Sequence, residues 1–274
     1  MPSNLRRVRI SGFQGQIREP WPSSVPVGEL LNKIGQPDGV IVKMRPDRAI
    51  KIKGDVHLKE EFLFGARSSW PLLVKSLWGR SRLRRQWQAS LFARERGIPT
   101  PEPLAYLEQR RSLVLSRSLL ATRYESSFVT LTQYLKRNIR EGWGRRRGSA
   151  FLKSLGFAVR RMHELGMVHS DLKGSNILVR EEGEGWSFKF TDLKAACFFD
   201  RERDRSRRRI RKEERDVIRL LSGLRPFFDR SERAFYLSSY LPAGGDEPGP
   251  IIARWEEESL RKFPAPPGQK RERG

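Results

Sequence analysis

The chain has 274 residues, of which 37% are hydrophobic and 32% are charged. This length and composition suit one large domain or two smaller ones with real cores, and they exclude a disulfide miniprotein or a metal-stapled finger. The 55 Lys and Arg against 32 Asp and Glu give a formal net charge of +23, which favours an anionic partner such as nucleic acid, anionic lipid or phosphorylated glycan. A single cysteine, Cys197, excludes an internal disulfide and suits a reducing compartment.

Neither a signal peptide nor an apolar stretch of membrane-spanning length is visible in the sequence, so we expect a cytoplasmic or peripheral protein.

The first half of the chain is predicted to form mainly a sheet with one helix. The first 39 residues give only weak strand signals, and the first clear pattern is a hairpin of strands at residues 40–44 and 49–53. Apolar residues four apart predict a helix over residues 81–96, which the Gly-Ile-Pro-Thr-Pro segment then ends. Two further strands are expected at residues 104–107 and 113–115.

The second half of the chain is predicted to be mainly helical. A helix is expected to begin at Thr130, and a longer one over residues 149–165 has the apolar spacing of a buried face. Alternating residues at 177–179 and 186–190 predict a hairpin with one buried face. Helices and a very basic stretch at residues 201–215 follow.

The chemistry-bearing motif lies between the long helix and that hairpin. Residues 169–176 read His-Ser-Asp-Leu-Lys-Gly-Ser-Asn, which resembles the kinase catalytic loop H-x-D-L-x-x-x-N with Ser170 in place of the usual Arg. Asp192 follows the hairpin, where a kinase places a magnesium-binding aspartate. The motif and its context together indicate phosphoryl transfer.

Phosphoryl transfer explains why these residue types are needed. A base must orient the acceptor hydroxyl, and cations must neutralise the phosphate oxygens. Asp171 is the candidate base, while Asn176 and Asp192 offer the oxygen ligands that Mg²⁺ prefers. A strand lysine should bind the ATP phosphates. We expect it to be Lys51, because Ala49-Ile50-Lys51 matches the end of the V-A-I-K motif, with Lys53 and Lys75 as alternatives.

Taken with flanking segments, these residues resemble the bacterial lipopolysaccharide core kinases, the Kdo and heptose kinase family (WaaP/InaA-like) of the protein-kinase-like superfamily. The flanking segments are residues 84–87, residues 97–101, the Thr-Asp-Leu at 191–193 and the Glu-Arg-Asp-Val-Ile-Arg-Leu at 214–220. The resemblance spans about residues 40–241. It implies ATP and Mg²⁺ as cofactors and a sugar hydroxyl of the lipopolysaccharide core as acceptor.

The resemblance also predicts an α+β, bilobal protein-kinase-like fold with a small β-rich N-lobe and a larger helical C-lobe. We expect an N-terminal extension or first strands over residues 1–39, the N-lobe over 40–118, the C-lobe over 119–263 and a disordered tail over 264–274. The hinge is expected near residues 116–120.

The sequence departs from the kinase pattern at several places. No G-x-G-x-x-G loop exists, with Gly35 and Gly39 as the only nearby candidates, and no A-P-E motif follows Asp192. Gln86 stands where relatives usually carry a glutamate, so a neutral hydrogen bond is expected in place of the ion pair with the strand lysine.

Other polar residues are expected to be structural. His169 is interpreted as a hydrogen-bonding residue under the loop, Asp216 as a brace for it or a solvated charge, and His57, His163 and Cys197 as ordinary residues.

The leading hypothesis is an ATP-dependent phosphotransferase with an alcohol acceptor on lipopolysaccharide or another anionic glycolipid, in peripheral contact with an anionic membrane surface and without a nucleic-acid partner. The alternatives are a kinase of protein or of a small molecule, and a catalytically weak anion-binding pseudokinase or scaffold. In the leading hypothesis the arginines at 201–215 would recruit the anionic acceptor.

Overall fold

A computed structural model describes residues 5–31, 40–45, 47–62, 81–111, 114–140, 142–200, 206–241 and 248–264. The chain divides into two compact units. The first comprises Met1–Arg96, Thr100–Ser126 and Asp192–Lys194, and the second comprises Gly97–Pro99, Ser127–Thr191 and Ala195–Gly274. The expected disordered tail falls, from residue 265 onward, outside the described residues.

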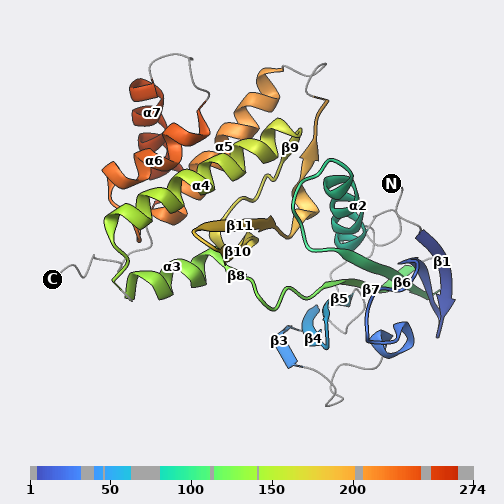
Figure 1. The fold of residues 1–274 in the computed structure, drawn as a ribbon. Helices are drawn as coiled ribbons and strands as arrows, with labels where there is room; N and C mark the ends of the chain where they lie inside the picture. The colour runs from blue at the N-terminus through green and yellow to red at the C-terminus, as the bar shows by residue number, and fades with distance from the viewer. Residues whose placement is uncertain are drawn as a thin grey trace. The chain divides into compact units, whose positions relative to one another are not determined.

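A seven-stranded antiparallel sheet forms the first unit, in the order β1-β2-β6-β7-β5-β4-β3 (Figure 1). Its elements are β1 (Leu5–Ile10), β2 (Phe13–Arg18), the 3-10 helix η1 (Val27–Leu31), β3 (Val40–Arg45), β4 (Arg48–Lys53), β5 (Val56–Phe62), α2 (Arg82–Glu95), β6 (Pro103–Arg111) and β7 (Val114–Arg123). The predicted β3–β4 hairpin and the helix α2 are confirmed. The weakly predicted N-terminal strands extend the sheet beside β6, and β5 is a strand that the sequence patterns did not predict.

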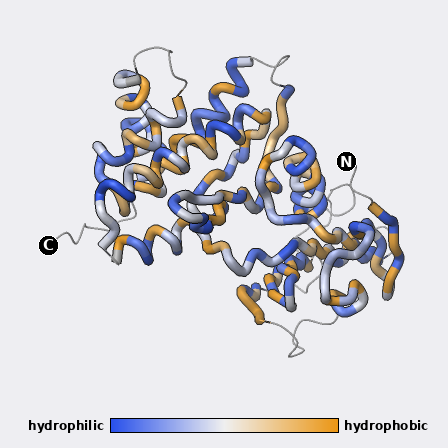
Figure 2. The backbone as a smooth tube through the Cα atoms, viewed as in Figure 1, coloured by the Kyte–Doolittle hydropathy of each residue, from blue (hydrophilic) through white to orange (hydrophobic). Residues whose placement is uncertain are grey.

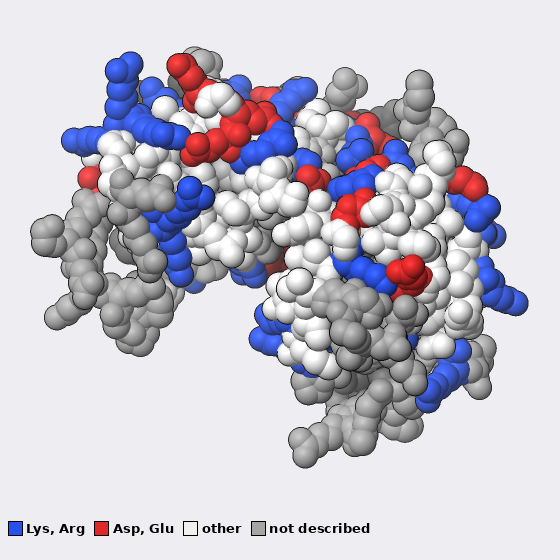
Figure 3. All heavy atoms as spheres, turned by 60° about the horizontal axis from the view of Figure 1, so that its bottom comes forward, with Lys and Arg blue, Asp and Glu red and all other residues white. Residues whose placement is uncertain are grey.

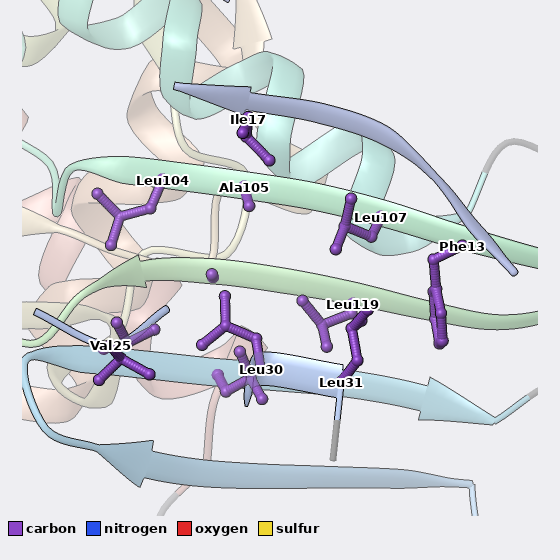
Figure 4. Packing of buried hydrophobic residues seen from close by; sticks show 12 residues of the cluster. Phe13, Ile17, Val25, Leu30, Leu31, Leu104, Ala105, Leu107 and Leu119 are labelled. Atoms are coloured by element: carbon purple, nitrogen blue, oxygen red, sulfur yellow. The ribbon is translucent and has the colours of Figure 1, made fainter. Parts of the chain in front are cut away.

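The two faces of this sheet bury different clusters. One face carries Leu58 of β5 with Leu107 and Leu119 of β6 and β7, packed with Val25 and Leu30 from the segment before β3 (Figure 4). On the other face, Leu83 and Trp87 of α2 pack against Tyr106 and Leu120. Because α2 covers only the second face, a side chain must lie on that face to meet the helix.

Local capping explains where α2 begins and ends. The Ser81 side chain accepts hydrogen bonds from the backbone N–H groups of Leu83 and Arg84, which satisfies two otherwise unpaired donors at the start of the helix. Gly97 follows the helix with a φ of +74°, a conformation that glycine adopts without steric cost.

The second unit is mainly helical and contains two small sheets. Its elements are β8 (Val129–Thr130), α3 (Leu131–Arg140), α4 (Arg145–Glu164), β9 (Met167–Val168), η2 (Gly174–Asn176), β10 (Ile177–Glu182), β11 (Gly185–Phe190), β12 (Cys197–Phe198), α5 (Arg207–Leu224), α6 (Arg230–Tyr240) and α7 (Pro248–Lys262), while η3 (Leu193–Ala195) crosses the division between the units. Along α4 and α5 in Figure 2, hydrophobic and hydrophilic residues alternate, as expected for helices with one buried face. The predicted β10–β11 hairpin and the helical C-terminal region are confirmed.

Helices α4 and α6 approach each other closely at Gly156. A Cβ atom at this position would lie 2.4 Å from the Tyr236 carbonyl oxygen, so a side chain would force the helices apart. Its neighbours Leu155 and Val159 on α4 are fully buried. The absence of a side chain at Gly156 therefore permits the close packing of α4 against α6.

The β-rich first unit and the helical second unit confirm the predicted α+β class. The division falls after Ser126, later than the expected boundary at residue 118. The expected hinge at residues 116–120 lies instead inside β7, which pairs with β5 and β6 along those residues. No helix in the described ranges is long and apolar enough to cross a membrane.

A buried ion pair links α6 to α7. Arg233 donates two hydrogen bonds to the Glu256 carboxylate, at 2.9 and 2.8 Å, and a third to the Phe228 carbonyl oxygen. Both side chains of the pair are less than a tenth exposed. Replacing Arg233 by alanine would leave the Glu256 carboxylate buried and unpaired, so we expect a loss of about 3–5 kcal/mol in the free energy of unfolding. Urea denaturation followed by circular dichroism measures this loss, and a loss below about 1 kcal/mol would contradict it.

Candidate active site

The catalytic-loop motif lies in the second unit, between β9 and β10. Two backbone N–H groups, those of His169 and Ser170, donate to the Asp216 Oδ2 at 2.7 and 3.2 Å. Asp216 lies on α5 and is 1% exposed, so a buried carboxylate anchors the backbone of the loop to this helix. This confirms Asp216 as the brace of the loop, the first of the two readings of this residue.

Asp216 is itself supported by a buried polar chain. His163 Nε2 lies 3.5 Å from its Oδ2, and His163 Nδ1 lies 2.7 Å from the Tyr240 hydroxyl. His163 is 4% exposed. His163 is therefore part of the support of the catalytic loop, not the ordinary residue expected from the sequence.

His169 fixes the loop from the other side. Its Nε2 lies 2.8 Å from the Thr191 carbonyl oxygen, and the Asp171 backbone N–H donates to its Nδ1 at 3.3 Å. The residue is fully buried. These contacts confirm the structural, hydrogen-bonding interpretation of His169.

The loop backbone is strained where it presents Asp171. Ser170 has a φ of +64°, in the left-handed region that costs a non-glycine residue about 1–3 kcal/mol. The hydrogen bonds from Ser170 and its neighbours to Asp216 and His169 offset this cost. Such strained residues cluster at functional sites, where the surrounding structure over-determines them.

Asn176 and Asp171 meet within the loop. The Asn176 Nδ2 donates to the Asp171 carbonyl oxygen at 3.0 Å and to its carboxylate at 3.3 Å. The amide nitrogen is thus used inside the loop, and the Oδ1 is the atom that Asn176 can offer to a cation. The structure brings these two predicted residues together.

The third predicted residue of this group, Asp192, belongs to the first unit. Its Oδ2 lies 2.7 Å from the Lys194 ammonium and its Oδ1 lies 3.6 Å from the Lys59 ammonium. Its φ is +60°, so it too is held in a strained conformation. Each oxygen of this carboxylate therefore faces one lysine ammonium.

The lysine beside Asp192 is Lys59, not Lys51. The Lys59 ammonium also lies 3.5 Å from Gln86 Oε1 on α2. Gln86 therefore makes a neutral hydrogen bond with a strand lysine, as expected, although its partner is on β5 and not on β4.

Strand register explains why Lys51 does not take this position. Lys51 pairs with Leu58 across β4 and β5, so both side chains lie on one face of the sheet, the face away from α2. Lys59 pairs with Leu120 of β7, which packs against α2 on the opposite face. The position beside Gln86 and Asp192 that was expected for Lys51 is therefore occupied by Lys59, and which lysine binds phosphate stays a prediction. Of the two rivals of Lys51, Lys53 pairs with Glu29 at 2.7 Å and Lys75 lies outside the described residues, as do Gly35 and Gly39.

Burial tunes the titratable groups of β5. Desolvation, with repulsion from Lys194, lowers the pKa of the Lys59 ammonium, while attraction to Asp192 partly offsets this change. Desolvation and the Lys59 charge lower the pKa of His57 from 6.5 to about 4. His57 and Lys59 are two residues apart on one strand and so share a face.

The His57 shift predicts a loss of stability in acid. Below pH 6.5 the unfolded chain binds a proton on this imidazole, whereas the folded protein does so only near pH 4, so the free energy of unfolding falls as pH drops through this window. A shift of this size corresponds to at most about 3 kcal/mol. Urea unfolding between pH 7 and pH 4 should show a shallower decline for His57→Gln than for the wild type, and parallel curves would contradict the assignment.

The predicted cation ligands carry donor atoms of the type that Mg²⁺ accepts. Mg²⁺ is usually held by one or two carboxylates together with substrate phosphates and water; Asp192 in the first unit has a carboxylate, and Asn176 in the second unit has an amide oxygen. Among the described residues, no cluster of three or more His, Cys, Asp or Glu side chains forms an all-protein metal cage. The residues present therefore suit a cation that arrives with a nucleotide.

Three functional candidates were missed in the sequence. Lys59 ends Val56-His57-Leu58-Lys59, which keeps the first and last residues of V-A-I-K. Lys173 and Arg219 both contact the Asp171 carboxylate, at 3.2 and 2.5 Å. Arg219 comes three residues after Asp216 on α5, a spacing that places both on one side of the helix.

Residues 201–205 of the predicted basic stretch lie outside the described residues, and the arginines within α5 differ in their exposure. Arg207, Arg208 and Arg211 are exposed, whereas Arg209 is buried, pairs with Glu213 at 2.7 Å and donates to the His163 carbonyl oxygen. On the face of the molecule in Figure 3, basic side chains are spread among acidic ones. Arg209 is thus a packing residue and not part of an anion-recruiting surface.

Comparison with known proteins shows the fold and the family of the chain. No curated protein matches the chain. A solved structure described as "WaaP in complex with acyl carrier protein" is similar with a TM-score of 0.60 and 18% identity, covering 94% of this chain and 99% of that chain. This likeness supports the kinase-like fold. The profile of the "Lipopolysaccharide kinase (Kdo/WaaP) family" matches residues 69–236, more than half of the sequence, and the chain therefore belongs to this family.

Proposed function

We propose that this protein is an ATP-dependent kinase that phosphorylates a sugar hydroxyl of the lipopolysaccharide core. The observation that carries the proposal is the strained, doubly braced loop that presents Asp171 beside Asn176, in a chain of the Kdo/WaaP family. Each unit of the chain carries part of the machinery that phosphoryl transfer requires.

In the second unit, Asp171 accepts the proton of the acceptor hydroxyl. Lys173 and Arg219 contact its carboxylate and orient it, and Asn176 fixes the loop through the Asp171 carbonyl oxygen. A positioned base of this kind contributes about 10²–10⁴-fold to the rate.

In the first unit, Lys59 binds the phosphates of ATP. Gln86 and Asp192 orient its ammonium group, so Lys59 takes the role expected of Lys51. Asp192 and Asn176 are the residues that would hold Mg²⁺, which when bound neutralises charge on the phosphate oxygens.

The net charge of +23 supports an anionic glycolipid as acceptor and peripheral contact with the anionic cytoplasmic face of the inner membrane. Arg207, Arg208 and Arg211 on α5 are exposed and could contribute to this attraction.

Radiolabelled ATP with Mg²⁺, offered in parallel with lipopolysaccharide, a generic protein and nucleic acid, tests the proposal. Label should appear on lipopolysaccharide in the wild type and be lost in Asp171→Asn. Label on the generic protein alone would favour a protein kinase. Absence of ATP turnover on every acceptor would favour an anion-binding scaffold.

A further inference from the structure

The Asp171 carboxylate lies between two cationic side chains from different segments. Arg219 Nη2 lies 2.5 Å from its Oδ1, and Lys173 Nζ lies 3.2 Å from its Oδ2. The three side chains are 19%, 29% and 45% exposed for Asp171, Arg219 and Lys173. All three reach the surface, so a bound acceptor can contact each of them.

The two carboxylate oxygens are not equally occupied. Oδ2 contacts both Lys173 and Asn176, whereas in the described part of the chain Oδ1 contacts Arg219. A carboxylate oxygen can accept two hydrogen bonds. A hydroxyl that gives its proton to Asp171 therefore fits Oδ1, on the side where Arg219 lies.

Arg219 is also held in place on its other side. Its guanidinium carbon lies 5.7 Å from the centre of the Phe263 ring, within the range of a cation–π interaction. A guanidinium has five N–H donors in a planar fork, more than one carboxylate oxygen can use. Arg219 can thus keep its ion pair with Asp171 and still donate two parallel hydrogen bonds to a second planar anion.

We propose that Arg219 binds a carboxylate of the acceptor next to the reacting hydroxyl, so that the enzyme selects an acidic sugar over a neutral one. This inference rests on the proposed kinase function. A monoanionic carboxylate suits the position better than a phosphate group, because the negative charge of Asp171 is close and would repel a more highly charged group more strongly.

The test uses one core oligosaccharide fragment in two forms, with the carboxylate of its acceptor sugar free or converted to the methyl ester. The wild type should show a KM for the free acid about 10–100-fold below that for the ester, the range expected for one charge-assisted bidentate contact. Arg219→Gln should raise the KM for the acid to near that for the ester. Arg219→Lys, which keeps the charge and loses the fork, should fall between the two.

Arg254→Gln is the matched control. Arg254 pairs with Glu214 of the same helix α5, also at 2.5 Å, and is 55% exposed. This variant removes an arginine–carboxylate pair without touching Asp171, and its KM values should equal those of the wild type.

A role of Arg219 confined to positioning Asp171 would lower kcat for both forms equally and leave the ratio of the two KM values unchanged, and this result would overturn the proposal. Calorimetric binding of both forms separates the inference from the kinase function. If neither form is phosphorylated by the wild type, the proposed function fails on this fragment. Preferential binding of the acid that is lost in Arg219→Gln would still support the role of Arg219, and equal binding of both forms would refute it.

Discussion

Replacing Asp171 by asparagine is expected to lower phosphoryl transfer by about 10²–10⁴-fold, the usual contribution of a positioned base. The substitution keeps the size of the side chain but removes the negative charge that accepts the hydroxyl proton. Asp171 is partly exposed, and the loop is held chiefly by Asp216 and His169, so the fold should persist. Transfer of radiolabel to lipopolysaccharide measures the rate, and thermal unfolding checks the fold.

A matched control for this variant is Glu182→Gln. Glu182 is an exposed carboxylate at the end of β10, paired with Arg180, and its loss should leave transfer unchanged. Near wild-type turnover in a pure preparation of Asp171→Asn would show that another group acts as the base.

Replacing Lys59 by methionine is expected to lower kcat by about 10²–10³-fold, comparable to the loss of one preorganised charged donor at a developing charge. Methionine keeps the length of the side chain and removes the ammonium that Gln86 and Asp192 orient. Because burial already disfavours this charge, the melting temperature should stay the same or rise. ATP turnover with Mg²⁺ and thermal unfolding are the two measurements.

Lys51→Met is the comparison that decides the assignment. Lys51 is 5% exposed and shares its face of the sheet with Leu58, so its loss should affect ATP turnover far less than the loss of Lys59. A normal rate in Lys59→Met together with an inactive Lys51→Met would return the phosphate lysine to β4.

The sequence was sufficient to predict the helices and hairpins whose formation depends on residues close together in the chain. The helix after Ser81 has its own cap and an apolar stripe, and the hairpin at β10–β11 alternates cleanly. The strand β5 was missed because Lys59, Glu60 and Glu61 make it resemble a polar loop. Glu60 is buried only because Arg117 of the neighbouring strand pairs with it, a contact that no sequence window contains.

The residues of the candidate site also divide into those that a local motif predicts and those that depend on contacts between distant segments. The sequence by itself was enough to predict Asp171 and Asn176, which belong to a short motif with a fixed spacing, and Asp192, which follows the hairpin after that motif. It also determined the family and the α+β class, which the profile match and the structure bear out.

Only the tertiary structure decided which lysine meets Gln86 and Asp192. Lys51 and Lys59 both lie on strands of the sheet, and the local sequence pattern cannot tell which of the two lysines meets α2 and Asp192. The register of β4 with β5 places them on opposite faces, and the packing of α2 on one face selects Lys59. Arg219 reaches Asp171 for the same reason, since α5 folds beneath a loop more than forty residues earlier in the chain. Pairing between distant segments is set by how the whole chain buries its apolar surface. No single stretch of the sequence is therefore enough to predict it.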